Sequence, residues 1–190
     1  MAMFKDHLYL TITVIFFGLI NSGGCFADVD DPSILIDTKT YSLTVLSASN
    51  RPLARFRNIS LGSGGISDTH LAGDATTPLG TFHIAWINPH SRFGIFFGLD
   101  YPTLSHGAHA LALGILDQAD YEAIFNAHYD GYLPPQNTVL GGQIGIHGIG
   151  EGNPEIQRHV NWTNGCIALP NADAVALGKW IHIGTKVIIR

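Results

Sequence analysis

The sequence predicts a single β-rich α+β domain with a few short helices, preceded by an N-terminal leader. Its 190 residues leave room for one domain of ordinary size and an appendage. Short apolar and β-branched runs alternate with turn signals along most of the chain, whereas few segments have helical spacing. The 22 glycines exceed the background of about 7% and indicate many turns and close backbone approaches.

Residues 1–27 have the pattern of a secretory signal. Lys5 precedes an apolar run from Leu8 to Ile20, which is shorter than the roughly 20 residues that a membrane-spanning helix needs. Small residues at Cys25 and Ala27 fit a cleavage site, so the predicted domain covers residues 28–190. We therefore expect a periplasmic, secreted protein with no stable membrane span after cleavage. An uncleaved anchor and lipidation at Cys25 are the alternatives.

Five strands are predicted from β-branched and aromatic runs bounded by turn residues. The first two are separated by a turn at Thr38-Lys39-Thr40, and the fourth follows a break at residues 76–80. The predicted strands are Ser33–Asp37, Tyr41–Leu46, Arg51–Ser60, Thr81–Ile87 and Lys186–Ile189.

Three helices are predicted from capping residues. Asp117 caps a helix over residues 118–129, Asn153-Pro154 opens a second, and Asn171 caps a third that ends near Ile181. The histidine-containing segment 105–109, with His106 and His109, is predicted as loop or surface. The segment 126–140, rich in turn residues, is predicted as a lid over the site.

Composition excludes several classes of protein. The apolar fraction of 46% excludes disorder. The formal charge of −5, with no basic block, excludes a nucleic-acid-binding protein. Two cysteines are too few for a disulfide scaffold. If Cys25 is removed with the signal, Cys166 is the one remaining cysteine. In an oxidising compartment an unpaired cysteine is either a buried packing residue or a nucleophile.

His147 and Cys166 form the most informative pair in the sequence. Taken singly, each has an ordinary structural interpretation, because free cysteines and single histidines are commonly buried. Together they suit nucleophilic catalysis, since an imidazole can activate a thiol that is mostly protonated at neutral pH. Asn164-Gly165 is a turn dipeptide just before the cysteine, and its exposed N–H groups could bind an oxyanion.

The segment from His147 to Leu169 resembles the L,D-transpeptidase catalytic domain (YkuD-type), whose signature is His, a spacer and then Ser/Thr-His-Gly-Cys. Here the spacer is Gly148 to Trp162, and Thr163-Asn164-Gly165-Cys166 follows. Thr77-Pro78-Leu79-Gly80-Thr81-Phe82, Ser91-Arg92-Phe93 with Tyr101-Pro102, and Gly141 to Gly148 resemble further family segments. The resemblance covers Ile34 to Ile189.

This resemblance implies an L,D-transpeptidase-like β-sandwich that acts in cell-wall biogenesis and cell shape. It implies cysteine-dependent acyl transfer on peptidoglycan stem peptides through a thioester, with wall-attached lipoprotein as a further candidate partner. No metal or cofactor is implied. The implied roles are nucleophile for Cys166, base for His147, oxyanion or orienting groups at Gly148, Asn164 and Gly165, and substrate binding by Thr163 and Tyr132.

The sequence departs from the family pattern at two positions. Asn164 replaces the usual histidine, and Ala168 replaces the usual arginine two residues after the cysteine. The missing arginine predicts a pocket without a fixed cation and a bias towards amide-linked substrates. For the same reason, Ala168→Arg is predicted to increase the use of donor peptides that end in a free carboxylate, relative to amide-linked substrates.

Three other functions remain open at this stage. The same residues suit a murein L,D-carboxypeptidase or amidase, in which water resolves the thioester. A non-catalytic wall-binding domain is a second alternative, because a fold alone does not determine function. A zinc hydrolase is the third, although the usual ligand spacings are missing. Its candidate ligands are His147, His159, Cys166 and His182.

Overall fold

The structure is a computed structural model that describes residues 31–190. The predicted signal segment and Cys25 therefore lie outside the described residues. Within residues 31–190, no helix is long and apolar enough to span a bilayer.

Eight strands form one mixed sheet in the order β3-β2-β1-β10-β6-β7-β8-β9, and β4 with β5 forms a separate pair. This architecture confirms the predicted β-rich α+β fold. All five predicted strands are present, although the third ends at Arg57 and the fourth is longer than predicted. The strands are β1 (Ser33–Asp37), β2 (Ser42–Leu46), β3 (Pro52–Arg57), β4 (Ile66–Ser67), β5 (Thr77–Pro78), β6 (Gly80–Ser91), β7 (Gly94–Leu99), β8 (Gly145–His147), β9 (Ile167–Ala168) and β10 (Lys186–Ile189).

The long strand β6 joins the two halves of the sandwich. Its first residues pair with β10, and its later residues pair with β7. Two register irregularities, between Ile84 and Trp86 and between Asn88 and Ser91, interrupt the β6–β7 ladder, where such bulges increase local bend and twist. The segment after β3 returns to β9, where Ser60 and Ala168 exchange two backbone hydrogen bonds of 2.9 Å. Hydrogen bonds therefore connect the segment that follows β3, one edge strand of the sheet, to β9, the other edge strand.

The core lies between the two halves of the sheet and under helix α4 (Asn171–Leu177), which packs against β7 and β8. Alternate apolar residues of β1 and β2 are buried, as expected when one face of a strand packs inward, whereas β8 and β9 are buried throughout. Leu177 contributes from the helix. The buried strand residues include Ile34, Ile36, Leu43, Val45, Phe82, Ile84, Phe97, Leu99, Ile146, Ile167, Val187 and Ile189.

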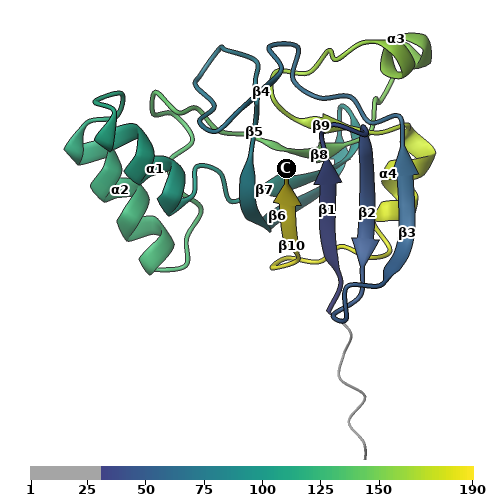
Figure 1. The fold of residues 1–190 in the computed structure, drawn as a ribbon, viewed down its shortest axis with the longest axis horizontal. Helices are drawn as coiled ribbons and strands as arrows, with labels where there is room; N and C mark the ends of the chain where they lie inside the picture. The colour runs from purple at the N-terminus through teal and green to yellow at the C-terminus, as the bar shows by residue number, and fades with distance from the viewer. Residues whose placement is uncertain (1–30) are drawn as a thin grey trace, which may run out of the picture.

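Helices α1 (Leu104–Ala112) and α2 (Gln118–Tyr129) form a hairpin beside the sheet (Figure 1). Two of the three predicted caps, Asp117 and Asn153, are present. The Asp117 side chain accepts a hydrogen bond from the Asp120 N–H, and Asn153 accepts one from Glu155 at the start of α3 (Pro154–His159). The last helix, α4, ends at Leu177 rather than near Ile181.

The prediction of a loop at residues 105–109 is wrong, and so is a surface position for His106, whereas His109 is exposed as predicted. These residues lie within α1, and His106 is only 4% exposed. The His106 ring stacks on Phe82 with centroids 5.4 Å apart. Its Nδ1 contacts Thr103 Oγ1 at 2.6 Å, and its Nε2 contacts the Leu79 carbonyl oxygen at 3.0 Å. These tertiary contacts stabilise a helix whose local sequence is only weakly helical.

Gly98 on β7 is a position where we predict that one added methyl group destabilises the fold. A Cβ there would overlap the indole ring of Trp86, which itself stacks on Phe96 with centroids 4.8 Å apart. Gly98→Ala should therefore lower the free energy of unfolding by about 1–3 kcal/mol. Thermal or urea unfolding followed by circular dichroism measures the change.

Gly107→Ala in α1 is the matched control. A Cβ at Gly107 would lie 3.3 Å from Tyr121 Cδ2 at the edge of the ring, and alanine favours a helix over glycine by about 1 kcal/mol. We expect little net change for Gly107→Ala. Equal stability of Gly98→Ala and the wild type would show that Trp86 moves without cost.

Candidate active site

Parallel pairing of β8 with β9 brings His147 and Cys166 to one end of the sheet. Ile146 pairs with Ile167 and His147 with Ala168, and the Leu169 N–H donates to the His147 carbonyl at 2.8 Å. Cys166 immediately precedes β9, and adjacent strands lie about 4.8 Å apart. Both side chains line a cavity of about 720 Å³.

The imidazole of His147 is held in one orientation. Its Nδ1 lies 2.6 Å from the Gly148 carbonyl oxygen, which can only accept, so Nδ1 carries the proton and Nε2 keeps its lone pair. The ring is 1% exposed and stacks on Phe93 and Phe96, with centroid distances of 4.2 and 5.6 Å. Burial lowers the pKa of His147, and Arg92 lowers it further, whereas the Gly148 hydrogen bond opposes both effects. At neutral pH the imidazole is therefore uncharged.

Asn171 fixes the loop that follows His147. Its Oδ1 accepts from the N–H groups of Ile149 and Gly150 at 2.8 and 2.9 Å, and its Nδ2 donates to the Gly150 carbonyl at 2.7 Å. A Cβ on Gly148 would lie 2.6 Å from Asn171 Oδ1, so this approach requires glycine. Asn171 is the first residue of α4 rather than its cap, because Pro170 holds the capping position.

Thr163 and Gly165 shape the turn before the cysteine. Thr163 Oγ1 donates to the Cys166 carbonyl at 2.6 Å and accepts from the Gly165 N–H at 3.2 Å. Gly165 has φ +121°, and a Cβ there would lie 2.7 Å from the Thr76 carbonyl oxygen. Thr163 lines the cavity, as a substrate-binding residue would, but its hydroxyl is engaged within the turn.

The thiol of Cys166 donates to the Gln143 carbonyl, with Sγ and oxygen 3.3 Å apart. Burial raises the pKa of Cys166 to about 11, and a backbone hydrogen bond from Gly145 opposes this shift only in part. The thiol is thus protonated at neutral pH. The resting site contains a neutral thiol and a neutral imidazole rather than an ion pair.

Sequence reasoning missed the residues that support this pair. Trp162 packs edge-on against His147, and its Nε1 donates to Gln157 Oε1 at 2.8 Å. Gln157 Nε2 also donates to the Ala168 carbonyl at 3.0 Å, which ties α3 to β9. Arg92, which the sequence places only in a segment that resembles the family, lines the cavity. Gln157 and Trp162 are visible in the sequence as part of the spacer between His147 and Thr163. A glutamine or a tryptophan does not by itself indicate that it will contact a catalytic histidine or a neighbouring strand.

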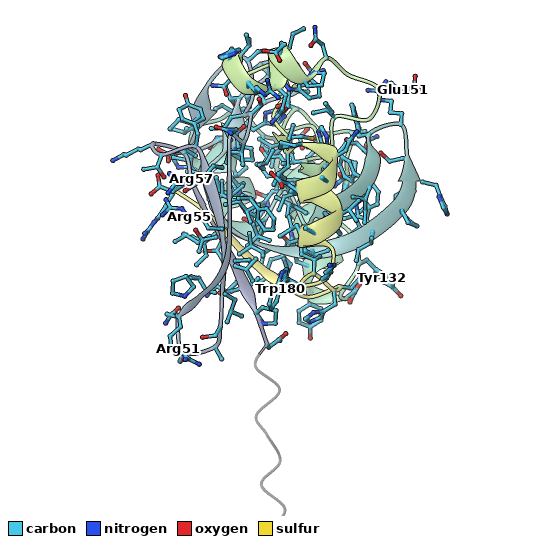
Figure 2. The ribbon with its side chains drawn as sticks, turned by 90° about the vertical axis from the view of Figure 1, so that its right-hand side faces the viewer. Arg51, Arg55, Arg57, Tyr132, Glu151 and Trp180 are labelled. Atoms are coloured by element: carbon cyan, nitrogen blue, oxygen red, sulfur yellow. The ribbon has the colours of Figure 1, made fainter. Side chains whose placement is uncertain are left out.

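Asn164 is exposed and lines the cavity, but Tyr132 does not line it. Tyr132 is 73% exposed, and Figure 2 places it at the lower edge of the molecule, far from Glu151 in the loop that follows His147. None of residues 126–140 lines the cavity, so the predicted lid is not observed. Gly131, at φ +74°, ends α2 and redirects the chain there.

The expectation that the pocket lacks a cation is also wrong. Ala168 is 0% exposed, exchanges hydrogen bonds with Ser60 and does not line the cavity. An arginine in its place would be buried, so Ala168→Arg no longer predicts a gain for carboxylate-ended donors. Arg92 brings a cation to the cavity from the β6–β7 turn instead.

The four candidate zinc ligands are not brought together. Within residues 31–190, no three His, Cys, Asp or Glu side chains form a group that could hold a metal ion. His159 lies on α3 and contacts Glu155, whereas His182 contacts Asp31. Neither lines the cavity that contains His147 and Cys166.

Comparison with known proteins identifies the fold and the family signature. The model of the L,D-transpeptidase catalytic domain family (YkuD) matches residues 31–189. The helical cell shape determining protein Pgp2 from Campylobacter jejuni has a similar structure, with 21% identity and a TM-score of 0.56 over 84% of this chain and 47% of that one. Bd1075 from Bdellovibrio bacteriovorus is 16% identical, with a TM-score of 0.53 over 85% of this chain and 48% of that one. The chain thus spans about half the length of these proteins, and no curated protein matches it.

The neutral state of the pair predicts how Cys166 reacts with a neutral alkylating agent. Because burial raises the pKa of Cys166 to about 11, the thiolate fraction should increase about tenfold per pH unit from pH 7 to 9. The rate of alkylation by iodoacetamide should follow that increase. Mass spectrometry of quenched samples measures the rate.

A thiolate–imidazolium pair would behave differently. The alkylation rate would then be nearly constant between pH 6 and 9, and such a plateau would contradict the neutral state. Circular dichroism at each pH is the control, since loss of structure would also expose the thiol.

Proposed function

Because this chain belongs to the L,D-transpeptidase catalytic domain family, we propose that it transfers acyl groups of peptidoglycan stem peptides through a thioester on Cys166. The observation that carries the proposal is the cavity shared by Cys166 and an oriented, neutral His147. Pgp2 and Bd1075 are about twice as long as the region that this chain matches. The activity of the whole protein is therefore proposed here and not inferred from those two proteins.

In the first half-reaction, the Cys166 hydrogen moves from the Gln143 carbonyl to Nε2 of His147. The thiolate attacks the amide carbonyl that follows the L-centre of diaminopimelate, forming a sulfur–carbon bond. The carbon–nitrogen bond then breaks, and the imidazolium returns its proton to the amine of the departing D-alanine. The lowered pKa of His147 keeps the base uncharged at the start of the first step, and it makes the imidazolium a stronger acid when the leaving amine is protonated.

The tetrahedral intermediate needs hydrogen-bond donors for its oxyanion. The backbone N–H groups of Gly165 and Asn164 remain the proposed donors. The Gly165 N–H is already shared with Thr163 Oγ1, over a long 3.2 Å contact. The N–H of Cys166 is a further candidate, because it donates to no acceptor within residues 31–190. Gly148 has a different proposed role, since its carbonyl orients His147.

In the second half-reaction, an amine of another stem peptide gives a proton to His147 and attacks the thioester, releasing the thiolate. Water in place of the amine would make the protein a murein L,D-carboxypeptidase. The name of Pgp2 as a helical cell shape determining protein supports a role in remodelling the wall and setting cell shape. Action on peptidoglycan in turn supports a location outside the cytoplasm, in line with the proposed signal over residues 1–27 and with Cys25 as a candidate lipid anchor.

Incubation with purified muropeptides tests this proposal. The wild-type chain should release D-alanine from tetrapeptide stems and form crosslinked products, which mass spectrometry detects. Cys166→Ser should abolish turnover while the fold is retained, because an unactivated alcohol is a far poorer nucleophile than a thiolate. His147→Ala should lose rate by roughly 10²–10⁴-fold, with a residual rate that increases with pH as free thiolate forms.

His159→Ala is the matched control, because His159 is an exposed histidine on α3 that does not line the cavity. It should retain the wild-type rate. Full activity of Cys166→Ser would refute the thiol mechanism, and a flat pH profile for His147→Ala would remove His147 as the base. Tripeptide stems without crosslinks would identify water as the acceptor.

A further inference from the structure

Arg92 lies over the aromatic ring that stacks on His147. Its guanidinium carbon lies 4.7 Å from the centre of the Phe93 ring, a distance at which cation and ring attract each other. The same ring stacks on His147 at 4.2 Å. Arg92, His147 and Cys166 all line the same cavity.

No carboxylate neutralises this guanidinium within the part of the chain that is described. The ion pairs of residues 31–190 do not include Arg92, and none of the residues lining the cavity is an aspartate or glutamate. The Arg92 side chain is exposed. An exposed cation on the wall of a cavity without acids attracts an anionic group of a ligand.

We propose that Arg92 binds the terminal carboxylate of the donor stem peptide and thereby selects donors that end in a free carboxylate. A guanidinium presents paired N–H donors that match the two oxygens of a carboxylate. That the ligand is a stem peptide, and hence that its anionic group is a carboxylate, rests on the proposed function, whereas the preference for an anion follows from the cavity itself. This preference is the reverse of the bias towards amide-linked substrates that Ala168 predicted from the sequence.

Alkylation of Cys166 by iodoacetate and by iodoacetamide tests the role of Arg92 without any peptide. In both reactions the thiolate forms a sulfur–carbon bond and iodide leaves, so the ratio of the two rates cancels the thiolate fraction. The two reagents differ mainly in one negative charge. The wild-type ratio of iodoacetate to iodoacetamide should fall several-fold in Arg92→Met and be largely retained in Arg92→Lys.

Arg57→Met is the matched control for this ratio. Arg57 is an exposed arginine on β3, on the flank of the molecule that also carries Arg51 and Arg55 (Figure 2). It does not line the cavity, so the ratio should stay at the wild-type value. An unchanged ratio in Arg92→Met, or an equal fall in Arg57→Met, would overturn the assignment.

A pair of peptides then tests the ligand itself. Acylation of Cys166 is measured with a tetrapeptide that ends in a free carboxylate and with its terminal carboxamide. At low peptide concentration, Arg92→Met should acylate about tenfold or more slowly than the wild type with the peptide that ends in a carboxylate. The loss should be far smaller with the peptide that ends in a carboxamide. Equal losses with both peptides would overturn the inference. A wild-type chain that neither peptide acylates would instead refute the proposed function, and the alkylation ratio would still decide the role of Arg92.

Discussion

Parallel pairing of β8 with β9 is the constraint on which the rest of the site depends. It brings His147, at the end of β8, near Cys166, which immediately precedes β9, although the segment that contains α3 separates the two residues in sequence. That segment stabilises the pairing, because Gln157 on α3 bonds the Ala168 carbonyl and holds the Trp162 indole against His147. From the other side, Asn171 secures the loop beyond Gly148.

Burial determines the charge state of the pair. A low-dielectric site disfavours charged forms, so it raises the pKa of the Cys166 thiol and lowers that of the His147 imidazole. Both shifts favour a neutral resting state, in which the histidine acts as a base only when the thiol turns towards it. Arg92 adds to this effect, because its positive charge disfavours an imidazolium nearby. The same cation favours an anionic ligand in the cavity.

Much of the fold was predictable because its signals are local. Alternation of buried residues in β1 and β2 and the Asp117 cap of α2 depend on neighbours in sequence, and all of them appear in the structure. Helix α1 was missed because its stability depends on distant contacts of His106 with Phe82 and Leu79. Ala168 was misjudged, and the position of Arg92 was not foreseen, for the same reason, since only the folded chain shows which of them faces the cavity.

The central claim is that Cys166 carries the acyl group. Rapid acid quenching of the chain with a tetrapeptide stem, followed by intact-mass measurement and peptide mapping, tests this directly. We expect an increase in mass equal to the tripeptide acyl group, located on Cys166 and removed by hydroxylamine. Release of D-alanine from the same mixture with no adduct on Cys166 at any quench time, and equal release by Cys166→Ala, would contradict it.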